Sequence, residues 1–504
     1  MFINKMKIKM KAGKIYAFLL VLTGSVFIQG CDNALNEEPK TFIAPDNFFA
    51  NADQCTQAVN GVYTSLYSVY GATVFWSMTE LGTDLSFSTD ANNLVPNDFT
   101  FNSGNTGTGG MWGTLYGAIK NSNMVIARVS KAPIDDKVKA RLVGETKFLR
   151  ALWYFILTNT FGDVPLWTDE LDVDAVSQLP RAPLADVRAQ IIRDLGEASE
   201  ALPPTTSASD AGRVTQGAAL TLLAKVYLYN QDWANAQKTA LRVVESGKYS
   251  LLPSYADVFD IWNRYKNNAE SIFAVQFLRN AATSNNVRTH QLVNYYMPTR
   301  DAGSSTYAGV DFGKYVIDGW HVYIPTARLV DMFEPNDLRR EVVLGYGYNG
   351  QKFKTWPKEN RPWYGPKFWD LEANAQASGK NLYVLRYADV LLMLAEAYNE
   401  QGNTAESVKW LNQVRKRAGL KELAGLSEGS LREAIMKERA IEFVGEYQRR
   451  PDLVRWGKLV EAVKSVADDN PVGAANIKPF HNYYPISADE IIKNPNLVQT
   501  TGYQ

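Results

Sequence analysis

The feature that most constrains the fold of this chain is a pattern of small and apolar residues that occurs twice. In each copy, apolar residues recur at the 3.6-residue period of a helix, and small residues occupy positions where a second helix could approach closely. The copies consist of Ala224, Tyr227, Ala236, Ala240 and Val243, and of Ala395, Tyr398, Ser407, Leu411 and Val414. Their internal offsets match, and Ala395 lies 171 positions after Ala224. A chain with this pattern is predicted to be built on closely packed helix pairs.

The offsets within each copy are those of a tetratricopeptide repeat. We therefore expect repeat-like helix pairs near residues 215–246 and 384–418. The pairs are not in tandem, because a segment rich in Gly, Pro, Asn, Tyr and Trp occupies residues 251–380 between them. In that insertion we expect long irregular loops with short β-hairpins and short strands such as 271–278 and 341–346. The predicted fold class is mainly α, with a single domain over residues 51–504.

The chain begins with a segment that is typical of export rather than of folded structure. Five lysines precede an apolar run from Ile15 to Ile28, and no acidic residue occurs before Asp32. This arrangement predicts a signal peptide over residues 1–30. The segment ends in Ile28-Gln29-Gly30-Cys31, which resembles a bacterial lipobox, so Cys31 is the predicted lipidation site. Residues 31–50 are then a lipidated tether, and we expect the protein to be anchored in a membrane.

Aromatic residues make up 12% of the chain, including 12 Trp, and many lie in irregular, polar stretches. Flat aromatic faces can stack on sugar rings, whereas carboxylate and amide groups bind the hydroxyls. This chemistry predicts a glycan-binding surface on the loops, where binding residues are usually found. The alternative is that the rings form a local core beneath the loops. The candidate glycan-binding residues are Trp76, Asp84, Asn92, Tyr295, Tyr296, Trp320 and Trp363.

Other kinds of site find little support in the sequence. Residues 345–350 (GYGYNG) fit the dinucleotide motif G-x-G-x-x-G, but no helix start follows, and Asn349-Gly350 is typical of a tight hairpin turn. Lys+Arg and Asp+Glu both number 53, which gives no sign of nucleic-acid binding. Three histidines and two cysteines are too few and too scattered for a transition-metal site. We expect no metal, no cofactor and no nucleic-acid partner.

An enzymatic alternative rests on two acidic residues. Glu80 and Asp84 would share one face if their segment were helical, and glycoside hydrolysis requires two carboxylates across a sugar-binding cleft. The other interpretation is that they cap, turn or hydrogen-bond without acid–base chemistry. We expect no catalytic residues.

Several ordered segments along the chain form a recognisable set. They are 112–116 (WGTLY), 150–155 (RALWYF), 161–166 (FGDVPL), 223–229 (LAKVYLY), 387–392 (YADVLL), 411–415 (LNQVR) and 484–486 (YPI). Together these segments resemble the SusD/RagB family of outer-membrane glycan-binding lipoproteins. The resemblance runs from Cys31 to Gln504, although Gly445, Tyr447 and Pro451 depart from the usual pattern.

The resemblance implies a non-catalytic protein at the surface of the outer membrane. It would capture oligosaccharides and deliver them to a partner, a TonB-dependent transporter of the SusC type. Two alternatives remain open: a surface glycoside hydrolase that uses a pair such as Glu80 and Asp84, and an assembly scaffold of repeat type that binds no glycan. The resemblance does not specify ligand residues, so the candidates above come from the aromatic pattern alone.

Overall fold

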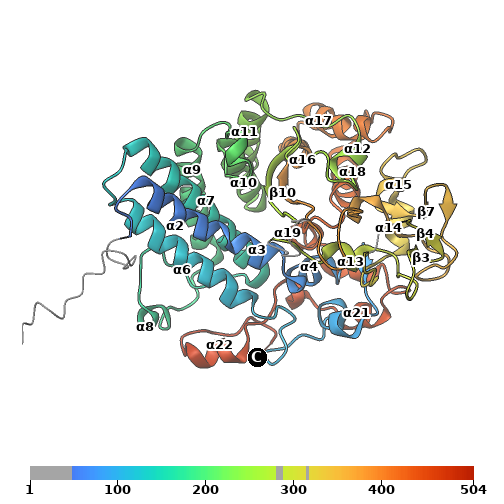
Figure 1. Cartoon of the computed structure of the whole chain (residues 1–504), viewed down its shortest axis with the longest axis horizontal. Helices are drawn as coiled ribbons and strands as arrows, with labels where there is room; N and C mark the ends of the chain where they lie inside the picture. The colour runs from blue at the N-terminus through green and yellow to red at the C-terminus, as the bar shows by residue number, and fades with distance from the viewer. Residues whose placement is uncertain (1–47, 280–287, 314–316, 504) are drawn as a thin grey trace, which may run out of the picture. The chain divides into compact units, whose positions relative to one another are not determined.

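A succession of helices, each packed on the next, forms the scaffold of the protein. The computed structural model describes residues 48–279, 288–313 and 317–503. The predicted signal peptide, Cys31 and all but the last three residues of the predicted tether lie outside them. The successive scaffold helices are α6 (Met111–Val129), α7 (Asp136–Phe161), α9 (Leu184–Ala201), α10 (Gln216–Tyr229), α11 (Trp233–Glu245), α16 (Tyr387–Glu400), α17 (Thr404–Arg417) and α18 (Glu428–Glu442). The expected mainly α fold is confirmed (Figure 1).

The two predicted helix pairs are present as α10–α11 and α16–α17, and α11 packs against α16 although the insertion separates them in sequence. Their small residues are buried, with Ala224 and Ala395 both 0% exposed. In the second pair a hydrogen bond also joins the two helices, because the Ser407 hydroxyl of α17 donates to the backbone carbonyl oxygen of Ala395 in α16 at 2.6 Å. Side chains at the helix starts cap the backbone, as Asn403 does for α17.

Shorter helices and strands surround this scaffold. Residues 49–504 form one compact unit. Its remaining helices are α2 (Ala52–Tyr63), α3 (Ser65–Tyr70), α4 (Thr73–Glu80), α5 (Leu94–Asp98), α8 (Val173–Val176), α12 (Tyr255–Val258), α13 (Leu292–Tyr296), α14 (Ala327–Met332), α15 (Arg340–Val343), α19 (Arg449–Arg455), α20 (Leu459–Lys464), α21 (Pro471–Asn476) and α22 (Ala488–Lys493). The strands are β1 (Ser86–Phe87), β2 (Ser271–Val275), β3 (Thr306–Tyr307), β4 (Val310–Asp311), β5 (Ile324–Pro325), β6 (Leu344–Gly345), β7 (Gly347–Tyr348), β8 (Gln351–Lys352), β9 (Trp363–Tyr364) and β10 (Leu382–Arg386).

The strands form antiparallel pairs that organise the insertion. β2 pairs with β10, so the segment begins and ends at the same place beside the scaffold. The hairpin predicted at Asn349-Gly350 is confirmed: β7 pairs with β8, and both turn residues have positive φ, as this turn requires. The strand expected over 341–346 is wrong for its first half, because residues 341–343 belong to the short helix α15 and only Leu344 and Gly345 pair as β6.

Buried ion pairs fasten the insertion to the scaffold. Arg386, at the end of β10, pairs with Glu270 at 2.7 Å and with Glu442 of α18 at 2.6 Å. Burial alone would raise the pKa of Glu442, but the guanidinium groups of Arg417, Arg386 and Arg339 hold it well below its usual range. Because such charges are costly to bury unless they are paired, these contacts fix the insertion in one arrangement.

Candidate functional site

Two of the predicted residues, Tyr295 and Trp320, form an aromatic platform at the surface. Trp320 is 37% exposed, whereas most tryptophans of the described chain are more deeply buried. Its ring meets the half-buried ring of Tyr295 edge to face, with 5.5 Å between the ring centroids. Beneath them, the buried ring of Trp76 meets the ring of Tyr295 edge to face, with 5.6 Å between the ring centroids. We call Tyr295 and Trp320 together the aromatic platform.

The backbone around α13 determines where the platform lies. Tyr295 belongs to α13, and the chain returns past that helix at residues 319–323. There the Trp320 N–H donates to the carbonyl of Asn294 at 2.8 Å, and the Val322 N–H donates to that of Tyr295 at 2.8 Å. Gly319 permits this approach, because a Cβ at that position would overlap the carbonyl oxygen of Pro298. The indole is therefore held on a fixed loop.

Polar groups border the platform on the side of α4. The Thr73 side chain hydrogen-bonds the Tyr295 hydroxyl, whose pKa is raised by burial and by the nearby carboxylate of Asp90. Asp90 Oδ1 in turn accepts from the backbone N–H of Asn92 at 3.0 Å, and Asn92 itself is exposed. Thr73 and Asp90 were not among the predicted residues. No sequence pattern around these two residues indicates a contact with α13, which lies more than 200 positions later in the chain.

Four other predicted residues lie in the interior, and for them the expectation of a surface glycan contact is wrong. They are Trp76, Asp84, Tyr296 and Trp363, all at most 4% exposed. The three aromatic rings among them pack against other segments: Tyr296 stacks on Phe368, with 3.9 Å between centroids and 6° between planes. The indole N–H of Trp76 donates to the carbonyl of Tyr70 at 2.6 Å. The rings thus form the local core beneath the loops, which was the alternative interpretation.

The carboxyl groups of Glu80 and Asp84 are fully engaged by their neighbours. Asp84 pairs with Arg449 at 2.7 Å and with Arg328 at 3.0 Å, and these guanidinium groups lower its pKa against the opposing effect of burial. Glu80 accepts from the backbone N–H of Tyr447 at 2.7 Å, and burial raises its pKa to about 7. Both residues are at most 2% exposed. This pair has no open cleft of the kind that a glycosidase requires.

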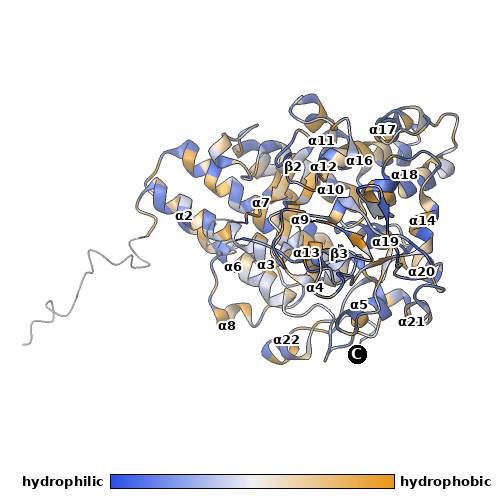
Figure 2. Cartoon of the chain, turned by 45° about the vertical axis from the view of Figure 1, so that its right-hand side comes forward, coloured by the Kyte–Doolittle hydropathy of each residue, from blue (hydrophilic) through white to orange (hydrophobic). Residues whose placement is uncertain are grey.

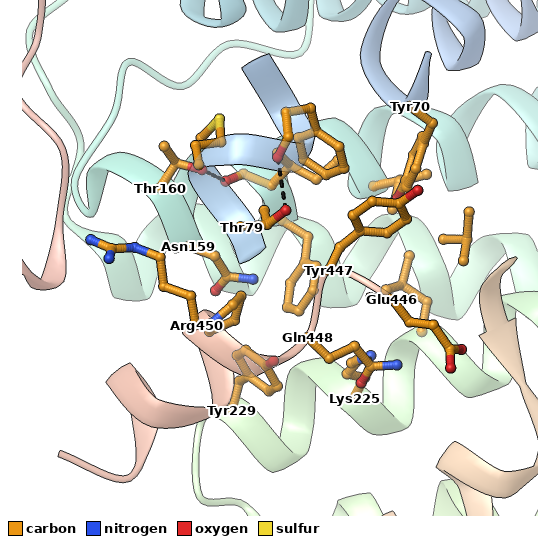
Figure 3. A pocket seen from close by; sticks show the side chains of 18 of the residues that line it. Tyr70, Thr79, Asn159, Thr160, Lys225, Tyr229, Glu446, Tyr447, Gln448 and Arg450 are labelled. Atoms are coloured by element: carbon orange, nitrogen blue, oxygen red, sulfur yellow. Dashed lines mark hydrogen bonds between the residues drawn. The ribbon is translucent and has the colours of Figure 1, made fainter. Parts of the chain in front are cut away.

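Hollows elsewhere in the protein were not predicted. A cavity of about 80 Å³ lies between α4, α7, α10 and the turn before α19, with Asn159, Tyr229, Tyr447 and Arg450 in its lining (Figure 3). At about 30 Å³ per water molecule, it has room for about two or three waters but not for a sugar ring. Tyr447 has φ of 63°, and in the described chain its buried hydroxyl has no hydrogen-bond partner.

Two larger hollows are open to the surface. One, of about 490 Å³, is lined by both polar and apolar groups and lies between the loop before α10 and the segment that leads into β2. The other, of about 290 Å³, is apolar and lies between α8 and α22, which both carry hydrophobic residues (Figure 2). The exposed side chains of Val173 and Ile492 extend this apolar surface.

In the part of the chain that the structure describes, no group of three or more His, Cys, Asp and Glu residues is placed to hold a metal ion. Within the same ranges, no helix combines the length and the hydrophobicity that crossing a bilayer demands.

Known families match both halves of the chain. A model of the SusD family matches residues 339–503, and a model described as "Starch-binding associating with outer membrane" matches residues 39–228. The chain is a SusD-like protein. The resemblance that the sequence motifs predicted is thus confirmed.

Relatives of this SusD-like protein match it over most of its length. SusD-like protein P25 of Formosa agariphila is 28% identical, with 96% of this chain and 97% of the relative covered. The starch-binding protein SusD of Bacteroides thetaiotaomicron is 23% identical, and the match covers 73% of this chain and 74% of that protein.

Solved structures of the family share the fold. A SusD superfamily protein from Bacteroides vulgatus has a TM-score of 0.78 and 26% identity, and the match covers 90% of this chain and all of the other. A structure described as a laminarin-binding SusD-like protein has a TM-score of 0.76 and 26% identity, with the same coverage.

Proposed function

We propose that this SusD-like protein is a non-catalytic glycan-binding lipoprotein of the outer membrane. It captures oligosaccharides on the aromatic platform and passes them to a TonB-dependent transporter of the SusC type. The single observation that carries the proposal is the exposed indole of Trp320, held against Tyr295 and bordered by hydrogen-bonding groups. The printed descriptions of its relatives, which name starch and laminarin, support this ligand class.

The platform has the chemistry that sugar rings require. The exposed part of the Trp320 indole offers an apolar surface for the C–H groups of a pyranose, and Asn92 supplies both a donor and an acceptor for hydroxyl groups. Because the Trp320 loop is already fixed by backbone hydrogen bonds to α13, little ordering is required when a ligand binds. Tyr295, Asn92 and Trp320 are the glycan-binding residues that we propose.

Anchoring and delivery complete the proposal. Residues 1–30 act as a signal peptide, Cys31 carries the acyl chains, and residues 31–50 link them to the fold. This arrangement places the platform on the membrane surface without a spanning helix. Glycan captured there would be concentrated beside the transporter that imports it.

Affinity electrophoresis in gels cast with starch or with laminarin tests the proposal. Trp320→Ala should weaken binding by about ten- to a hundredfold, the equivalent of 1–3 kcal/mol for a stacking contact. The matched control is Tyr265→Ala, which removes another exposed aromatic side chain, 44% exposed and distant in sequence from the platform.

The two variants separate the possible outcomes. Loss of retardation in Trp320→Ala alone, with an unchanged melting temperature, supports the platform. Full affinity in Trp320→Ala contradicts it, and so does equal loss in both variants. Release of reducing ends from either polysaccharide would instead favour a hydrolase.

A further inference from the structure

The side chain of Asn294 joins three segments beneath the aromatic platform. Asn294 lies in α13 and is 1% exposed. Its Nδ2 donates to the carbonyl oxygen of Asp318 at 2.6 Å and to that of Ala375 at 2.9 Å. The backbone carbonyl oxygen of Asn294 accepts from the backbone N–H of Trp320 at 2.8 Å. One residue thus contacts both the loop that carries the exposed indole and the loop behind it.

These two loops are also joined to each other. The Asp318 N–H donates to the Ala375 carbonyl at 3.0 Å, and Ile317 forms a β-bridge with Ala375. The two loops are therefore joined to each other, and the Asn294 amide adds a side-chain tie between that pair and α13, beside the backbone hydrogen bonds of Trp320 and Val322. The approach is so close that Gly319 has no room for a Cβ against Pro298.

We propose that Asn294 is a positioning residue for glycan binding: its side chain holds the Trp320 indole in the orientation that a sugar requires. This inference rests on the proposed function of the platform. Without the amide, the carbonyl oxygens of Asp318 and Ala375 each lose a donor, so the loop pair is held less firmly against α13. Affinity then falls in proportion to the fraction of molecules whose loop keeps the binding orientation.

The experiment is a double-mutant cycle measured in laminarin and starch gels and by calorimetry with the polysaccharide that binds. Asn294→Leu keeps the volume of the side chain but removes both donors, and Asn294→Ala is the second variant. Each is made alone and combined with Trp320→Ala. The control is Asn399→Leu, because Asn399 is also fully buried and donates to a backbone carbonyl, that of Glu428, within the scaffold.

We expect Asn294→Leu to bind about tenfold more weakly, which corresponds to one molecule in ten with a competent loop. In the Trp320→Ala background the same substitution should have no further effect, because there is no indole left to position. Asn399→Leu should lower stability and leave affinity unchanged. A purely structural role for Asn294 would not produce this dependence on Trp320.

Three results would overturn the inference. The first is full affinity in both Asn294 variants. The second is an equal loss of affinity with and without the Trp320 indole, which would mean that Asn294 acts on binding by another route. The third is wild-type affinity in Trp320→Ala alone, which removes the proposed platform itself and identifies the failure as that of the proposed function.

Discussion

Replacing Gly445 with alanine should destabilise the protein through a specific steric overlap. Gly445 lies in the turn between α18 and α19 with φ of 73°, a left-handed conformation that costs an alanine about 1–2 kcal/mol. A Cβ there would also overlap the ring of Phe368, which stacks on Tyr296 in the loop core. Overpacking of this kind adds about 1–3 kcal/mol. The total expected loss is about 2–5 kcal/mol in the free energy of unfolding.

Gly457→Ala is the matched control for this prediction. Gly457 has φ of 68°, but a Cβ there meets no heavy atom within 4 Å. It should therefore show only the conformational cost of about 1–2 kcal/mol. Urea denaturation of both variants, followed by tryptophan fluorescence, measures the difference. Equal destabilisation by the two substitutions would refute the packing argument, since it would leave nothing for the overlap with Phe368 to explain.

Three further predictions concern the anchor, the helix pairs and pH. Cys31→Ala should release the protein from the membrane fraction, and a variant that still labels with palmitate would contradict lipidation at this residue. Ala395→Trp should lower the melting temperature by overpacking the α16–α17 contact, and an unchanged value would count against that close approach. Acidification from about pH 6.5 towards pH 4 should lower stability, because burial lowers the pKa of three histidines to about 4, so that the unfolded chain takes up protons first. They are His290, His321 and His481. Glu80 acts in the opposite sense, because its raised pKa favours the folded state at low pH, but this one carboxyl group is outweighed by the three histidines. Urea denaturation midpoints measured at pH 7 and pH 5 test this prediction, and a higher midpoint at pH 5 would contradict it.

The sequence predicted burial well in the helices and poorly in the loops, for one physical reason. In α7 the partners of Leu149 and Trp153 follow from the helical period, and both are fully buried as expected. In the insertion, burial depends on contacts between residues distant in sequence, such as Tyr296 with Phe368. No local pattern distinguishes Tyr296, which is buried, from its neighbour Tyr295, which reaches the surface. The family and fold class were therefore predictable, whereas the composition of the platform was only partly so.

The packing of α11 on α16 has a consequence for the order in which the protein can fold. Lys225 of α10 pairs with Asp389 of α16, a partner 164 positions later in the chain. That carboxylate also binds Arg439 of α18. The buried lysine therefore lacks its charge partner, Asp389, until more than three quarters of the chain exists. A nascent or truncated chain that ends within the insertion would expose the apolar face of α11 and an uncompensated charge together. Such a chain should remain open and accessible to proteases, and the completed protein should fold in one late step instead of domain by domain.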